Sequence, residues 1–276
     1  MTVYLLRGLL IALLVYGLVV VLAWRYQDHL AFPAPRTRLP APRDVGLRDG
    51  RRVEVRAADG VVLRGWYLPP ASGTPRPAPG LLWFCGNMET VAGVGPIAAA
   101  WRPPEMALLF LDYRGYGESE GAPTEAGLYL DGEAAWAFLA AQPEVDAGRI
   151  ALYGRSLGSA VALELASHHP ARAVVLESPF TSARALARLH YWFLPGVLVR
   201  LSMDNLGRAR ALTVPLLVAH GTADPIAPIA MGRAVAEAGH AKLFLAIEGA
   251  GHNDTYDVGG ERYRAAVIAF LREALE

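Results

Sequence analysis

The sequence is poor in cysteine and in unbalanced charge. Cys85 is the single cysteine among 276 residues, so no disulfide can form within the chain. The formal net charge is zero, and no basic patch or run of like charges stands out, which speaks against nucleic acid as a partner. Internal repeats and long low-complexity stretches are also missing. With 53% hydrophobic residues, the chain is long and apolar enough to fold around a substantial core.

Two groups of cofactor-binding motifs are absent as well. The sequence contains no His-Glu-x-x-His motif of the kind that binds zinc. Residues 114–121, RGYGESEG, are rich in glycine but have neither the spacing of a dinucleotide-binding motif nor that of a P-loop. We therefore predict a protein that works without a metal ion and without a cofactor.

One long hydrophobic run lies at the amino end. Gly8–Trp24 carries no charge and would span about 26 Å as a helix, slightly less than the ~30 Å hydrocarbon core of a bilayer. Val3–Leu6 can extend this helix if Arg7 reaches the head groups. The run exceeds the ~7–15 residues of a usual signal-peptide core, so we predict that residues 1–24 are a single-pass membrane anchor. A signal peptide cleaved near Val21–Ala23 and a buried core helix are the alternatives.

The segment after the run is rich in proline and arginine. More arginines follow the hydrophobic run than precede it. By the positive-inside rule this weakly favours a body on the cytoplasmic side, and it does not decide the orientation. Residues 25–50 are expected to form an extended linker, and residues 51–276 a folded domain. That domain begins with a predicted hairpin, whose strands are residues 51–57 and 61–69.

Short apolar runs then alternate with segments of helical periodicity. Continuous rather than alternating apolar runs are typical of strands buried on both faces of a parallel sheet. The alternation predicts an α/β fold, a mostly parallel sheet covered by helices on both faces. Functional residues of such sheets follow the carboxyl ends of the strands. The runs are residues 81–85, 107–112, 150–154, 173–178, 215–221 and 242–249.

A serine follows the third of these runs. Residues 154–158 read Gly-Arg-Ser-Leu-Gly, a Gly-x-Ser-x-Gly motif at the junction of a predicted strand and helix. A nucleophilic serine needs a sharp turn, and Gly154 and Gly158 have no Cβ, so strand and helix can approach closely around it. The amino end of the helix would point at Ser156 and favour a developing negative charge. The motif indicates a nucleophile elbow.

Two partners for this serine follow later strands. Asp224 follows the run 215–221, and His252 follows the run 242–249. The order Ser156, Asp224, His252 along the chain is the order of an α/β-hydrolase catalytic triad, in which the histidine removes the proton of the serine. Each residue alone has an ordinary loop interpretation, but three matches at three strand ends favour the triad.

Other residues complete or compete with this site. The oxyanion donors are expected to be the backbone N–H of Leu157 and that of Asn87, in the loop after the run 81–85. Cys85 has no elbow around it, so we interpret it as a buried apolar residue rather than a nucleophile. Glu177, at the end of the next strand, is the alternative triad acid.

These motifs together resemble those of α/β-hydrolases, and more narrowly those of the membrane-anchored Bem46/ABHD13-like serine hydrolases. The resemblance runs from the apolar run to the last helix. It implies an eight-stranded sheet, a Ser–His–Asp triad and esterase or thioesterase activity without a cofactor. The oxyanion loop departs from the family pattern, because Cys85 replaces a histidine and Met88–Glu89 replace small residues. The matching stretches are DGVVLRGWYLP, FCGN, LDYRGYGESEG, GRSLGSAVA, LESPFTS, HGTADPIAP and GAGHND.

An apolar, aromatic segment occupies the position of a cap. Residues 189–203, which include Trp192 and Phe193, lie between two strands and are too short for a large lid. They are expected to line an acyl pocket or to touch the bilayer, unless they form a packed helix without substrate contact.

The sequence thus predicts a membrane-anchored serine hydrolase that cleaves carboxylic esters or thioesters of an acyl or lipid-like small molecule. Two alternatives remain open: a catalytically silent, membrane-tethered binding protein with a hydrolase fold, and a peptidase that uses the same triad.

Overall fold

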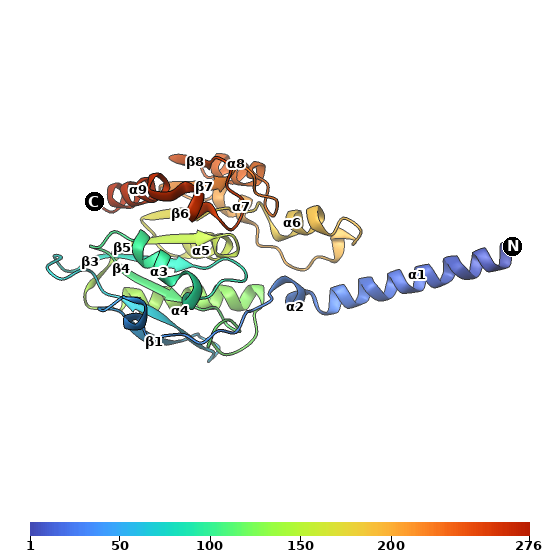
Figure 1. Ribbon diagram of the computed structural model, residues 1–276, viewed down its shortest axis with the longest axis horizontal. Coiled ribbons are helices and arrows are strands. Elements are labelled where there is room, and N and C mark those ends of the chain that lie inside the picture. Colours follow the sequence, from blue (N-terminus) through green and yellow to red (C-terminus); the bar gives the residue numbers. More distant parts are fainter.

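The computed structural model describes residues 1–276 and contains one eight-stranded sheet, as predicted (Figure 1). The strand order is β1-β2-β4-β3-β5-β6-β7-β8; β1 and β2 are antiparallel to their neighbours, and all other pairs are parallel. The predicted hairpin is therefore the pair β1–β2. The strands are β1 (Arg51–Arg56), β2 (Val62–Leu68), β3 (Ala78–Phe84), β4 (Ala107–Leu111), β5 (Val145–Arg155), β6 (Ala173–Glu177), β7 (Leu216–Gly221) and β8 (Leu243–Ile247).

Helices cover both faces of this sheet, which confirms the predicted fold class. The helices α4, α5, α7 and α8 pack against one another on one face, whereas α3 and α9 meet on the other. The central strands β3 to β7 are buried almost throughout, which explains their continuous apolar runs. The body helices are α3 (Val91–Trp101), α4 (Glu125–Ala140), α5 (Leu157–His168), α6 (Ala183–His190), α7 (Asn205–Arg210), α8 (Ile229–Ala238) and α9 (Thr255–Leu275).

A long apolar helix projects from this body at the amino end (Figure 1). Helix α1 (Thr2–Arg25) is 24 residues long, contains an 18-residue stretch with a mean hydropathy of 2.6, and buries none of its residues in the protein. At about 1.5 Å per residue it is ~36 Å long, enough to cross a hydrocarbon core of ~30 Å. By length and composition it could be a membrane anchor or a signal sequence.

The segment expected to be an extended linker packs on the body. It contains the short helix α2 (Gln27–Ala31), which ends before Pro33 because a residue that precedes proline avoids the helical conformation. An extended stretch then crosses the body, where Phe32 and Leu39 are buried among the core side chains. A single 3-10 turn, Pro42–Val45, precedes β1. These contacts hold the start of the chain against the hydrolase-like body.

Candidate active site

Ser156 lies on a strained turn between β5 and α5. Its backbone angles are φ 48° and ψ −110°, in a region that residues other than glycine rarely adopt. A Cβ at Gly154 would lie 2.4 Å from the carbonyl oxygen of Gly158, and a Cβ at Gly158 would lie 2.2 Å from that of Phe84. Glycine at both positions therefore lets α5 start directly against the ends of β5 and β3. The turn carries Ser156 at the carboxyl edge of the sheet.

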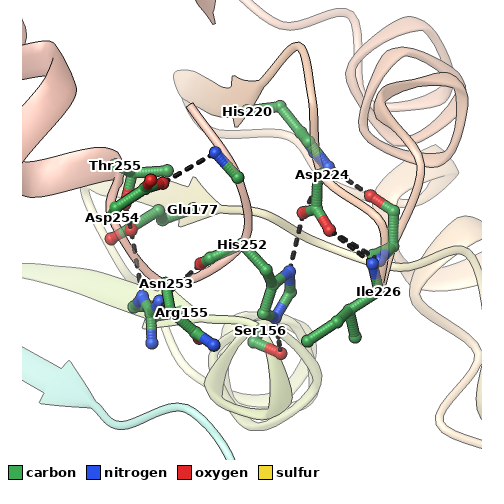
Figure 2. Close-up of polar contacts among 12 residues, drawn as sticks. Arg155, Ser156, Glu177, His220, Asp224, Ile226, His252, Asn253, Asp254 and Thr255 are labelled. Atoms are coloured by element: carbon green, nitrogen blue, oxygen red, sulfur yellow. Dashed lines mark hydrogen bonds and ion pairs between the residues drawn. The ribbon is translucent and has the colours of Figure 1, made fainter. Parts of the chain in front are cut away.

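Three side chains from three strand ends meet at this turn. His252 Nε2 lies 2.9 Å from Ser156 Oγ, and His252 Nδ1 lies 2.6 Å from Asp224 Oδ2 (Figure 2). Asp224 follows β7, and His252 follows β8. The imidazole is thus held between a hydroxyl on one side and a carboxylate on the other. In this geometry Nε2 can accept the proton of Ser156 while Nδ1–H donates to Asp224.

The carboxylate of Asp224 is held by three hydrogen bonds and lies beside a second histidine. Oδ1 accepts the backbone N–H groups of Ile226 (2.8 Å) and Ala227 (2.9 Å), and Oδ2 faces His252 Nδ1. His220 Nε2 lies 2.7 Å from the carbonyl oxygen of Ala227 and 3.2 Å from Asp224 Oδ2. Burial opposes the charge of Asp224, but the two histidines outweigh it and hold its pKa well below the usual range. Asp224 is therefore an ionised acceptor for His252. His220 was not identified from the sequence. The feature that could have identified it is its position in HGTAD, four residues before Asp224.

The alternative acid, Glu177, is committed to other partners. Its carboxylate is fully buried and accepts hydrogen bonds from Tyr153 Oη (2.6 Å), Arg155 Nε (3.0 Å) and the hydroxyl of Thr255. No hydrogen bond joins it to His252. Glu177 therefore belongs to a buried ion-pair network behind the elbow, whereas Asp224 is the acid that contacts the imidazole.

Arg155 is the centre of that network and was not singled out from the sequence. Its guanidinium pairs with Glu177, and Nη2 donates to the carbonyl of His252 at 2.5 Å (Figure 2). The guanidinium also pairs with Glu89. Burial disfavours the charge, but the two glutamates outweigh it and raise the pKa of Arg155. One side chain thus ties the elbow to the loop that carries His252. In the sequence, the feature that could have identified it is a charged residue directly after the apolar run 150–154.

The loop after β3 lies beside the elbow. Glu89, which departs from the family pattern, accepts the Gly86 N–H at 2.6 Å and pairs with Arg155, so it braces this loop against the elbow. The N–H of Asn87 donates to no group of the protein, and Leu157 is the first residue of α5, so its N–H has no partner within the helix. The N–H groups of Asn87 and Leu157 are therefore free to donate hydrogen bonds to an anion. Cys85 is buried, and burial raises the pKa of its thiol well above the ordinary value, which disfavours the nucleophilic thiolate.

The side chain of Asn87 connects this loop to the segment that leaves α1. Its Nδ2 donates to the carbonyl of Ala31 at 2.8 Å, and its Oδ1 accepts from Tyr116 Oη at 2.6 Å. Because Ala31 is the last residue of α2, the candidate oxyanion loop is bound directly to the segment that follows α1. The sequence offered no sign of this contact.

The cap consists of α6 and an irregular loop that returns to α7. None of the residues of α6 is buried, and Trp192 and Phe193 in the loop are 81% and 46% exposed. The interpretation as a packed helix is therefore wrong for this loop. At the base of the cap, His190 Nε2 lies 2.7 Å from the carbonyl oxygen of Ile226, in the turn that holds Asp224.

We expect Arg155→Met to lower the free energy of unfolding by about 3–5 kcal/mol, because it leaves Glu89 and Glu177 as buried charges without their cation. Urea unfolding followed by far-ultraviolet circular dichroism in detergent measures the change. The matched control is Arg149→Met in the same strand, whose half-exposed pair with Asp146 should contribute at most ~1 kcal/mol. Equal stabilities of the two variants would contradict the network.

The chain is similar to several known proteins over most of its length. Residues 76–206 match the family described as serine aminopeptidase, S33. An uncharacterized protein of Mycobacterium tuberculosis is 38% identical over 268 residues, which cover 96% of this chain and 93% of the relative. Protein bem46 of Schizosaccharomyces pombe is 31% identical over 266 residues, covering 91% and 87% of the two chains.

Solved structures share the fold at lower identity. An esterase of Pyrococcus furiosus superposes with a TM-score of 0.70 at 22% identity and covers 88% of this chain and 100% of its own. The esterase domain of a Rhodothermus marinus protein gives a TM-score of 0.60 at 23% identity, with coverages of 81% and 98%. At these identities the likeness concerns the fold alone.

Proposed function

Because the chain belongs to the Bem46-like α/β-hydrolases, we propose that this hydrolase is a membrane-anchored serine enzyme that cleaves carboxylic esters or thioesters. The observation that carries the proposal is the continuous hydrogen-bonded path from Ser156 Oγ through His252 to Asp224. The apolar, unburied helix α1 supports the anchor.

The reaction follows from this geometry. Ser156 Oγ attacks the acyl carbon while its proton moves to His252 Nε2, and Asp224 stabilises the imidazolium that forms. The N–H groups of Asn87 and Leu157 hold the oxyanion of the tetrahedral intermediate. His252 then passes the proton to the leaving alkoxide or thiolate, and the acyl group stays on Ser156. A water molecule, deprotonated by His252, releases the acid and restores the serine.

A peptidase is the second candidate, because the matching family is described as serine aminopeptidases. An aminopeptidase binds the ammonium group of its substrate, which calls for a free carboxylate near the nucleophile. Around the elbow, Glu89 and Glu177 both pair with Arg155, and Asp224 is bound to His252. This use of the local carboxylates favours esters. The silent binding protein is disfavoured because the histidine lies within hydrogen-bonding distance of both partners.

The test is covalent labelling of the full chain in detergent with a fluorophosphonate, followed by mass mapping. We expect one adduct, on the peptide that contains Ser156, and hydrolysis of nitrophenyl esters and thioesters but not of aminoacyl nitroanilides. The absence of an adduct from folded protein would overturn the serine hydrolase and favour the binding protein. Faster cleavage of the nitroanilides would favour the peptidase.

A further inference from the structure

The exposed apolar surface of the body is concentrated in the cap tip, which we define as residues 191–197. Trp192 is 81% exposed and Val197 is 88% exposed, and Tyr191 and Phe193 are about half exposed. The four lie within these seven residues, directly after α6. A contiguous group of large apolar side chains that the protein itself leaves uncovered marks an interaction surface.

Helix α1, the proposed membrane anchor, lies next to the cap. Tyr16 Oη donates to the carbonyl oxygen of Phe193 at 2.8 Å. The Arg200 guanidinium lies over the Trp24 ring, 5.4 Å from its centre. Gln27, at the start of α2, contacts the backbone of the same loop, donating to Leu198 O at 3.0 Å and accepting from Arg200 N at 2.6 Å. The cap and α1 leave the body on the same side (Figure 1).

The position of Tyr16 sets the depth of this contact. Tyr16 lies eight residues before Trp24, which corresponds to about 12 Å along the axis of α1. Trp24 and Arg25, at the end of α1, are residue types that favour the membrane–water interface. A cap tip that contacts Tyr16 therefore lies alongside the part of α1 that enters the bilayer.

The charges of α6 and the unpaired N–H groups of the cap tip both fit a position at the lipid head groups. Residues 183–203 contain no acidic residue, and Arg184 and Arg188 are exposed on α6 behind the tip. Arginines behind an apolar tip complement anionic head groups. Turns satisfy several N–H groups of the tip, such as Leu194 N to Tyr191 O, but the N–H groups of Trp192 and Val197 have no partner in the protein. Unpaired donors are costly in hydrocarbon and are satisfied at the head-group level.

We propose that the cap tip is a second membrane contact, inserted at the boundary between head groups and acyl chains of the leaflet that α1 enters. The cap base touches the turn that holds Asp224 through His190, so the active site opens next to this contact. The substrate class is then a membrane-resident acyl ester that reaches Ser156 from the bilayer. This inference rests on the anchor and the ester chemistry proposed above.

Depth-dependent quenching tests the contact itself. Cys85 is buried with a raised thiol pKa, so Val197→Cys introduces the single reactive thiol of the full chain, and the unsubstituted protein checks this. The variant is labelled with a fluorophore and reconstituted into vesicles of neutral and anionic phospholipids with brominated acyl chains. The matched control is Ser72→Cys, exposed in the loop before β3 at the opposite end of the body (Figure 1).

We expect shallow bromines, about 5–10 Å below the head groups, to quench the label at position 197 and to leave that at position 72 unchanged. Equal quenching of the two labels in vesicles that carry the protein would overturn the membrane contact, whatever the activity of the protein. The cap tip would then be a surface for a protein partner or for a second copy of the chain. Protein that does not float with vesicles would overturn the anchor, and this inference with it.

An activity measurement separates the contact from the chemistry. Val197→Glu should reduce hydrolysis of a long-chain ester in anionic vesicles about tenfold, the factor in an equilibrium constant that corresponds to burying one valine side chain. Hydrolysis of a short soluble ester should be unchanged. Equal loss on both substrates would overturn the role of the cap in substrate access. Quenching at position 197 without hydrolysis of any ester would refute the proposed function and leave the membrane contact standing.

Discussion

Ser156→Ala is expected to lower kcat by about 10⁶-fold and to abolish fluorophosphonate labelling. Residues of a nucleophile–base pair act as a unit, so the loss of the serine removes the covalent route entirely. The His252 imidazole and the backbone N–H groups remain in place, and they can still bind an ester without transferring its acyl group. Initial rates with the best ester of a nitrophenyl series, corrected for the folded fraction, measure the effect.

Ser167→Ala is the control for this change. Ser167 lies in the same helix, α5, but near its other end, where its hydroxyl donates to the carbonyl of Glu164 and is exposed. It should keep wild-type labelling and turnover. If Ser156→Ala retained labelling, another hydroxyl would carry the chemistry and the elbow would be a structural turn.

Asp224→Asn is expected to lower kcat by about 10⁴-fold while the protein stays folded. Both carboxylate oxygens of Asp224 accept hydrogen bonds, so an amide must turn its NH₂ group toward one of the donors. The two backbone N–H groups on Oδ1 fix the amide oxygen there and point the NH₂ group at His252 Nδ1. His252 Nδ1 then accepts a hydrogen bond from the NH₂ group, so the ring proton lies on Nε2, where the proton of Ser156 should be received. Rates and circular dichroism, measured together, separate this loss from unfolding.

Glu177→Gln distinguishes the two candidate acids. Its carboxylate pairs with Arg155 and does not contact His252, so this variant should lose stability and keep most of its kcat. The opposite ranking, with a larger kcat loss for Glu177→Gln than for Asp224→Asn, would make Glu177 the acid. The low pKa of Asp224 also means that its charge does not set the pH profile, because it stays ionised wherever the protein is assayed.

The sequence predicted the sheet and the residues at its edge for related reasons. Buried parallel strands must be apolar on both faces, so β3 to β7 were visible as short apolar runs, and the polar residues after them stood out. Gly154 and Gly158 were informative because only glycine allows the approach of α5 that the structure has. Local sequence therefore predicted the fold and the strand ends at which the candidate triad residues lie.

Contacts between distant parts of the chain could not be predicted in this way. Arg155 joins Glu89 and Glu177, which lie 66 and 22 residues away, and no local pattern links the three. The packing of residues 32–41 on the body depends on a surface that forms only when the sheet is complete. Proline and arginine content alone indicated an extended linker, because composition does not reveal what a segment can pack against.

The hydrogen bond between Asn87 and Ala31 links cleavage of the segment after α1 to the state of the candidate oxyanion loop. With α1 as the proposed anchor, a protease that cuts between Ala31 and Phe32 would free the body from the bilayer and also leave the carbonyl that holds the Asn87 side chain on the anchor fragment. The shed fragment would keep Ser156, His252 and Asp224, yet its loop of anion-binding N–H groups would lose one of its two side-chain restraints. Release from the membrane would then act as inactivation rather than as secretion of a working enzyme.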